Sequence, residues 1–130
     1  MIYEFCAENV TLLEKAMQAG ARRIELCDNL AVGGTTPSYG VTKAAVELAA
    51  NYDTTIMTMI RPRGGVFVYN DLEIAIMLED IRLTALAGSQ GVVFGALTAD
   101  KKLDKPVNSF KLILITQFIK GHVKDNFHSF

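Results

Sequence analysis

Hydrophobic residues recur along this chain with two alternating spacings. Short apolar runs at residues 2–6, 22–27, 54–60 and 91–95 are typical of β-strands. Residues 7–20, 41–52 and 71–88 lie between these runs and carry hydrophobic side chains three or four positions apart, which is the helical spacing. This alternation predicts βαβ units, a parallel sheet and helices outside it, which is the α/β class.

The segment 71–88 is the clearest predicted helix. Asp71 is expected to cap its N-terminus, and Gly88 is expected to end it. Its hydrophobic residues are expected to lie mostly on one side of the helix: Ile74, Ile76, Met77, Ile81, Leu83 and Leu86. The passages AGARRIELC and AGSQGVVFG both run from a helix end into a strand, which is consistent with repeated βα units.

After Asp104 the alternation weakens. Residues 110–119 form an apolar run that fits either a helix or a fifth strand, and a polar tail follows it. His122 and His128 lie in that tail, where we expect solvated side chains. A four-stranded open sheet has two unpaired edges, so we expect either a covering segment or self-association.

Length and composition fit a single soluble domain in the cytoplasm. The chain has 130 residues, half of them hydrophobic, and a net charge of -1. That charge gives no reason to expect a nucleic acid or a membrane as partner. Neither a signal peptide nor an apolar run of membrane-spanning length is present. The two cysteines are then expected to be free thiols or metal ligands, with a redox pair left open.

The order Glu-x-Cys ends two consecutive predicted strands. Alternate residues of a strand face the same side, so Glu4 lies with Cys6 and Glu25 lies with Cys27. Neighbouring parallel strands are about 4.8 Å apart, so both thiols could touch one small ion. Thiolates suit Cu(I) or Zn(II), which makes Cys6 and Cys27 candidate metal ligands.

Two methionines share a face of the third predicted strand. Met57 and Met59 could add thioether sulfur to a metal site. The alternative is that the cysteines and methionines are ordinary core residues, because neither a CxxC motif nor a histidine cluster accompanies them.

The strand glutamates need partners if they are buried. Arg61 and Arg63, at the end of the third predicted strand, are the expected partners of Glu4 and Glu25. Ligands of α/β proteins bind at the carboxyl ends of parallel strands, so this set could form a substrate site. The alternative is a set of structural ion pairs.

Two long loops follow the second and third predicted strands, at residues 29–40 and 61–71. Loops of this length in compact domains are often functional. Each contains a glycine pair that could present backbone N–H groups or simply form tight turns: Gly33, Gly34, Gly64 and Gly65. With Arg61 and Arg63 as a clamp, the loops predict a pocket for a small anionic molecule.

Several of these stretches together resemble the CutC family of copper homeostasis proteins. They are EFCAENV, RIELC, GGTTPS, IRPRGG followed by F-x-Y, and GVVFG-x-LT-x-D, and they fall within residues 1–104. The resemblance implies a TIM-like (β/α)8 barrel, a cytoplasmic location and a role in copper handling. A whole barrel takes about 250 residues, so this chain would hold only the first four βα units.

The resemblance also implies functional residues. The family's copper connection would transfer to Cys6 and Cys27, and its polar set to Glu4, Glu25, Arg61 and Arg63. Residues 105–130 do not match, which suggests unrelated sequence of the kind that a shifted reading frame produces.

Three hypotheses follow. The first is a copper homeostasis protein that binds Cu(I) through Cys6 and Cys27. The second is a barrel enzyme acting on a small anionic substrate, with Glu4 or Glu25 as acid/base and Arg61 as anchor. The third is a truncated product without activity.

Overall fold

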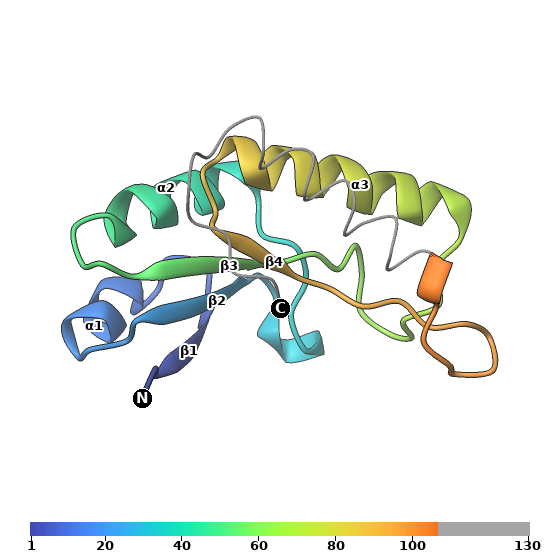
Figure 1. The fold of residues 1–130 in the computed structure, drawn as a ribbon, viewed down its shortest axis with the longest axis horizontal. Helices are drawn as coiled ribbons and strands as arrows, with labels where there is room; N and C mark the ends of the chain where they lie inside the picture. The colour runs from blue at the N-terminus through green and yellow to red at the C-terminus, as the bar shows by residue number, and fades with distance from the viewer. Residues whose placement is uncertain (107–130) are drawn as a thin grey trace.

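A computed structural model of the chain describes residues 1–106 (Figure 1). The elements follow in the order β1 (Glu4–Glu8), α1 (Leu13–Gln18), β2 (Arg23–Cys27), η1 (Leu30–Val32), α2 (Tyr39–Ala49), β3 (Thr55–Met59), α3 (Asp71–Leu86) and β4 (Gly91–Val93). The apolar run 110–119, His122 and His128 lie outside the described residues.

The four strands form one sheet in the order β1-β2-β3-β4, and every neighbouring pair is parallel. Cys6 lies opposite Glu25, which lies opposite Met57, which lies opposite Gly91. The predicted α/β class, with a helix between consecutive strands, is therefore confirmed.

The first strand begins later than its apolar run predicts. The sequence predicts a strand over residues 2–6, whereas β1 covers Glu4–Glu8. Its position is set by pairing with β2, where Glu4 faces Arg23 and Glu8 faces Cys27. Tyr3 lies before the strand, and its carbonyl accepts hydrogen bonds from the N–H groups of Arg22 and Arg23.

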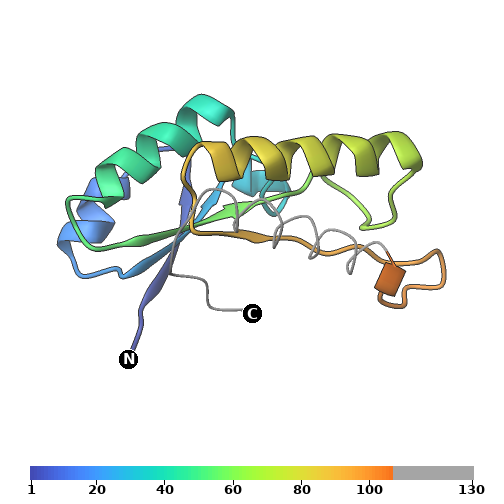
Figure 2. The same cartoon turned by 45° about the horizontal axis from the view of Figure 1, so that its top comes forward.

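All three α-helices cover one face of the sheet, with α2 and α3 side by side (Figure 2). The strand residues beneath them are aliphatic or small and have no exposed surface: Ile24, Leu26, Ile56 and Thr58. One cluster joins these strands to α1 and α2, and a second joins Ile60 and Val92 to α3. Burial of this apolar area is the main force that holds the helices on the sheet.

Helix α3 is capped by Asn70, not by Asp71 as predicted. The Asn70 side chain accepts a hydrogen bond from the N–H of Glu73 at 2.8 Å, and the Glu73 carboxylate accepts one from the N–H of Asn70 at 3.0 Å. This reciprocal capping box satisfies two helix N-terminal donors, which a cap at Asp71 would leave one residue out of place.

The buried stripe of α3 is narrower than its hydrophobic pattern predicts. Met77 and Ile81 face the sheet and are buried, whereas Ile76 and Leu86 are 45% and 47% exposed. The sheet covers only the line of the helix that faces β3 and β4, so hydrophobic residues to either side of that line stay at the surface. Within residues 1–106, no helix combines the length and apolar character needed to cross a bilayer.

Candidate metal site

The sheet face opposite the helices carries the reactive side chains. Strand alternation places Cys6 of β1 on this face, together with Glu25 and Cys27 of β2 and Met57 and Met59 of β3. Both cysteines are free thiols, Cys6 exposed and Cys27 buried. The face that does not build the core is therefore the one with metal-binding chemistry.

The two thiols lie next to each other. Cys6 Sγ and Cys27 Sγ are 3.8 Å apart, and Cys27 Sγ lies 4.0 Å from Oε1 of Glu25. One ligand atom from each of these three residues lies within 4.8 Å of the other two, and no other such group occurs among residues 1–106. The cysteines are staggered by one alternation step, because Cys6 lies opposite Glu25 and Cys27 lies opposite Glu8. The side chains of the two cysteines point toward each other along the strands, which brings the sulfur atoms together in spite of this offset.

The spacing of the thiols suits a shared metal ion. Zn–S bonds are about 2.3 Å long, so two of them meeting at a tetrahedral angle separate their sulfur atoms by about 3.8 Å. Cys6 Sγ and Cys27 Sγ already have that separation. The residues present therefore fit a thiophilic ion without a change in the strands.

Two of the candidate ligands, the Cys27 thiol and the Glu25 carboxyl, have raised pKa values. Burial raises the pKa of the Cys27 thiol to about 12, and the neighbouring Cys6 thiol adds to the shift. Burial also raises the pKa of the Glu25 carboxyl, with a further contribution from the charge of Glu4. At neutral pH the Cys27 thiol is protonated, so an incoming metal ion must displace its proton.

Gly34 closes over the thiol of Cys27. Its φ of +93° belongs to the left-handed region, and a Cβ at this position would lie 3.2 Å from Cys27 Sγ. The hydrogen in place of a side chain lets the loop approach the sulfur closely. The glycine pair in the sequence indicates a tight loop, but the need for a glycine beside the sulfur follows only from the folded structure.

Arg61 ties the two long loops together. Its guanidinium donates to the carbonyls of Val32 at 2.7 Å, Gly34 at 3.0 Å and Gly65 at 2.9 Å, and it lies 4.7 Å from the centre of the Phe67 ring. The residue is only 7% exposed. Arg61 thus holds Gly34 against the thiol site by binding the backbone of the loop.

Arg63 serves the second loop alone. It forms a two-pronged ion pair with the Glu73 carboxylate at 2.7 and 3.1 Å. It also donates to the carbonyls of Val66 and Val68 at 2.7 Å each, and its guanidinium lies 5.0 Å from the centre of the Tyr69 ring. Arg63 therefore fastens the loop after β3 to the start of α3.

The expected ion pairs between strand glutamates and these two arginines are wrong. Glu4 pairs with Arg23 at 2.5 Å, across β1 and β2. Arg61 and Arg63 turn into the loops, where carbonyl groups and Glu73 occupy them. The signal for Arg23 was present in the sequence, because it shares the face of Glu25 two residues before it.

The glycine pairs shape the loops. Gly33 donates its N–H to the carbonyl of Leu30 at 2.9 Å, and Gly34 donates to that of Asn29 at 3.1 Å. A Cβ on Gly64 would lie 3.1 Å from Cβ of Val32, so the two loops pack tightly there. The N–H groups of the first pair are therefore engaged within their own loop.

Comparisons with known proteins identify a family for this chain. The sequence model of the CutC family matches residues 1–120. The chain belongs to the CutC family. This confirms the resemblance carried by RIELC, GGTTPS and IRPRGG.

Relatives in the CutC family come from distant organisms. The family protein CutC of Enterococcus faecalis is 55% identical over 105 residues, which are 81% of this chain and 50% of the relative. The human copper homeostasis protein cutC homolog is 47% identical over 104 residues, 80% of this chain and 37% of the relative. The chain spans about half the length of the curated relatives it matches, or less.

A solved CutC structure has the same fold. The crystal structure of CutC from Streptococcus agalactiae superposes with a TM-score of 0.85 at 47% sequence identity, covering 89% of this chain and 55% of that one. That CutC fold is TIM-barrel-like, and the four parallel strands described here correspond to part of it.

Proposed function

We propose that this chain binds Cu(I) through Cys6 and Cys27 and takes part in copper homeostasis in the cytoplasm. The observation that carries the proposal is the pair of free thiols with their Sγ atoms 3.8 Å apart. The name of the human relative, a copper homeostasis protein homolog, supports copper over other thiophilic metals. Free thiols at this separation suit a reducing compartment, which supports the cytoplasm.

The exposures of the two thiols suit capture and retention. Cys6 is exposed and offers an incoming ion its first sulfur, while Cys27 is fully buried beneath Gly34 and offers the second. Soft thiolate ligands favour Cu(I) over hard cations such as Mg²⁺. Copper is the cargo in this proposal, and the protein's part is to supply the sulfur pair.

An enzyme acting on a small anionic substrate is the second candidate. The raised pKa of Glu25 favours it, because a carboxyl that keeps its proton to higher pH can serve as a general acid. Its proposed anchors are less favourable, since Arg61 donates to three backbone carbonyls and Arg63 is paired with Glu73. Copper binding is therefore the stronger proposal.

An anaerobic competition titration tests the copper proposal. The purified chain competes with a chromophoric Cu(I) chelator, alongside the Cys6→Ser/Cys27→Ser variant. We expect stoichiometric Cu(I) binding by the wild-type chain and its loss in the variant, with circular dichroism showing that both are equally folded. Equal Cu(I) affinity in the two chains would contradict the proposal.

A thermal-shift experiment addresses the second candidate. Phosphate and a small dicarboxylate are added to the wild-type chain and to the Arg61→Lys variant. The enzyme proposal expects an increase in melting temperature that depends on Arg61, and no change in ligand binding when Cu(I) is added. The copper proposal expects no anion protection.

A further inference from the structure

We propose that the thiol pair selects its metal through the third ligand: the Met59 thioether completes the site for Cu(I), and the Glu25 carboxylate completes it for Zn(II). This inference rests on the proposed copper function and concerns selectivity at the same site. It gives Met59 a role as a metal ligand, in addition to the two cysteines of the proposed function.

Met59 lies beside Cys27 on the neighbouring strand. Leu26 pairs with Thr58, so the next residues along the two strands, Cys27 and Met59, lie side by side and face the same way. A Cβ on Gly34 would be 3.2 Å from Cys27 Sγ and 3.7 Å from Cε of Met59. The Cys27 thiol and the terminal methyl of Met59 therefore both lie within 4 Å of the place where a Gly34 side chain would begin.

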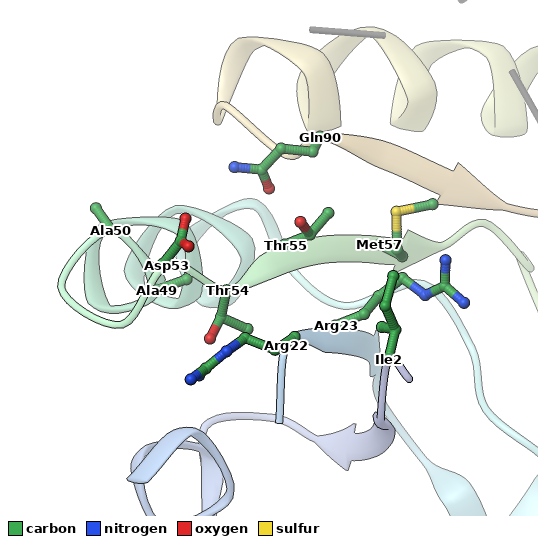
Figure 3. Close-up of a pocket in the computed structure, with 10 residues that line it drawn as sticks. All are labelled: Ile2, Arg22, Arg23, Ala49, Ala50, Asp53, Thr54, Thr55, Met57 and Gln90. Atoms are coloured by element: carbon green, nitrogen blue, oxygen red, sulfur yellow. The ribbon is translucent and has the colours of Figure 1, made fainter. Parts of the chain in front are cut away.

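Met57, the other methionine on this face, occupies a different place. It lies at the level of Glu25, two residues nearer the start of β3. Its side chain lines a hollow of about 610 Å³ at the N-terminal ends of the strands, together with Ile2, Arg23 and Gln90 (Figure 3). Met57 is nearly fully buried there, whereas Met59 is half-buried beneath the loop.

Glu25 approaches the thiol pair from the N-terminal side of β2. Its Oε1 atom lies 4.0 Å from Cys27 Sγ, and it precedes Cys27 by two residues on the same face. Cys27 thus has the Glu25 carboxylate before it on its own strand and Met59 beside it on the neighbouring strand.

The two candidate third ligands differ in softness. A thioether binds Cu(I) well and Zn(II) poorly, whereas a carboxylate is a common Zn(II) ligand and a poor one for Cu(I). One thiol pair with both neighbours can therefore hold either ion, with a different residue completing each site. This predicts that single substitutions separate the two affinities.

The test compares two variants against two metals. Cu(I) and Zn(II) affinities of the full chain are measured anaerobically by chelator competition for wild type, Met59→Leu and Glu25→Gln. We expect Met59→Leu to lower Cu(I) affinity about tenfold or more and leave Zn(II) affinity unchanged, and Glu25→Gln to do the reverse. X-ray absorption of the Cu(I) form should show one fewer sulfur neighbour in Met59→Leu.

Met57→Leu is the matched control, because it makes the same change on the same strand and face. It should leave both affinities and the sulfur coordination unchanged. Unchanged Cu(I) affinity in Met59→Leu, or an equal loss in Met57→Leu, would overturn the selectivity inference while leaving the cysteine pair in place. Retention of Cu(I) by the Cys6→Ser/Cys27→Ser variant would instead remove the proposed function and this inference together.

Discussion

The two faces of the four-stranded sheet contrast in what they carry. On the helix-covered face, Ile24, Leu26 and Ile56 are fully buried and build the core. On the other face, Cys6 lies opposite Glu25 on the neighbouring strand, and the thiols of Cys6 and Cys27 lie close together beside the Glu25 carboxylate. Along each strand, residues that pack in the core therefore alternate with residues that face the candidate metal site.

This contrast separates stability from binding. A change on the covered face removes apolar contacts that hold the helices, whereas a change on the other face alters ligands while most of the core stays packed. The loops after β2 and β3 are the exception, because Arg61 and Gly34 connect the second face to the rest of the fold. The predictions below test this division, from the largest expected effect to the smallest.

The largest effect is expected for Ile56→Ala on the covered face. Ile56 has no exposed surface, and truncating it should lower the free energy of unfolding by about 2–5 kcal/mol through lost contacts and a cavity. Met59→Leu, on the other face, conserves volume and should cost less than about 1.5 kcal/mol. Urea denaturation followed by circular dichroism measures both, and equal losses would contradict the division between the faces.

A somewhat smaller effect is expected for Arg61→Ala. The substitution leaves three loop carbonyls without their donor, so we expect the free energy of unfolding to fall by about 3 kcal/mol. Arg82→Ala is the matched control, because Arg82 forms an exposed ion pair with Glu79 one turn away on α3, and its loss should cost less than about 1 kcal/mol. Similar losses in urea denaturation would show that Arg61 does not clamp the loops.

Two glycines with positive φ isolate the close approach at the thiol. Gly34→Ala and Gly20→Ala both place alanine in the left-handed region, with φ of +93° and +102°. Among residues 1–106, no neighbouring atom lies within 4 Å of a Cβ on Gly20, whereas a Cβ on Gly34 meets Cys27 Sγ at 3.2 Å. We expect a loss of about 1 kcal/mol for Gly20→Ala and about 2 kcal/mol for Gly34→Ala.

The Gly34→Ala substitution should also change the accessibility of the Cys27 thiol. In Gly34→Ala the loop must move away from Cys27, so a thiol reagent should modify Cys27 faster in this variant than in Gly20→Ala, while the exposed Cys6 reacts equally in both. Equal modification rates would mean that Gly34 does not cover the thiol.

The smallest effect concerns acid pH and the Arg63–Glu73 pair. The Arg63 guanidinium, followed by the Asn70 N–H, holds the pKa of the Glu73 carboxyl below its usual range. A lowered folded-state pKa adds stability above the unfolded pKa, and this contribution is lost as pH falls through the folded value. The urea midpoint should therefore decrease below about pH 4, and Glu73→Gln should decrease less over the same interval. An identical pH profile for Glu73→Gln would contradict the assignment.

The sequence predicts the core of this fold well, because strand and helix periodicities are properties of each segment by itself. Four strands and three helices occur in the predicted order and overlap the predicted segments, although α1 covers only Leu13–Gln18 of the helix predicted over residues 7–20. The start of β1 is not predictable in this way, since pairing of Glu4 with Arg23 and Glu8 with Cys27 decides it. Local pattern locates a strand, and its neighbour sets its ends.

The candidate site is predictable only in part, for a related reason. Alternation within RIELC places Glu25 on the same face as Cys27. The ion pairs, however, depend on the conformations that the long charged side chains adopt in the folded protein. Arg61 enters its loops and Arg23 takes Glu4, and both outcomes depend on contacts between distant segments. The closeness of Gly34 to the sulfur likewise arises from the folded loop.

The thiol pair is assembled from residues 21 positions apart, held together by the β1–β2 ladder. In an unfolded chain the two sulfurs separate, so a bidentate ligand exists only while the ladder is intact. Any ion bound by both thiols is therefore thermodynamically linked to folding, and it raises the melting temperature as its free concentration exceeds the dissociation constant. By the same linkage, separation of β1 from β2 would part the two sulfur atoms and release the bound ion, so the stability of this strand pair sets how long the ion is held.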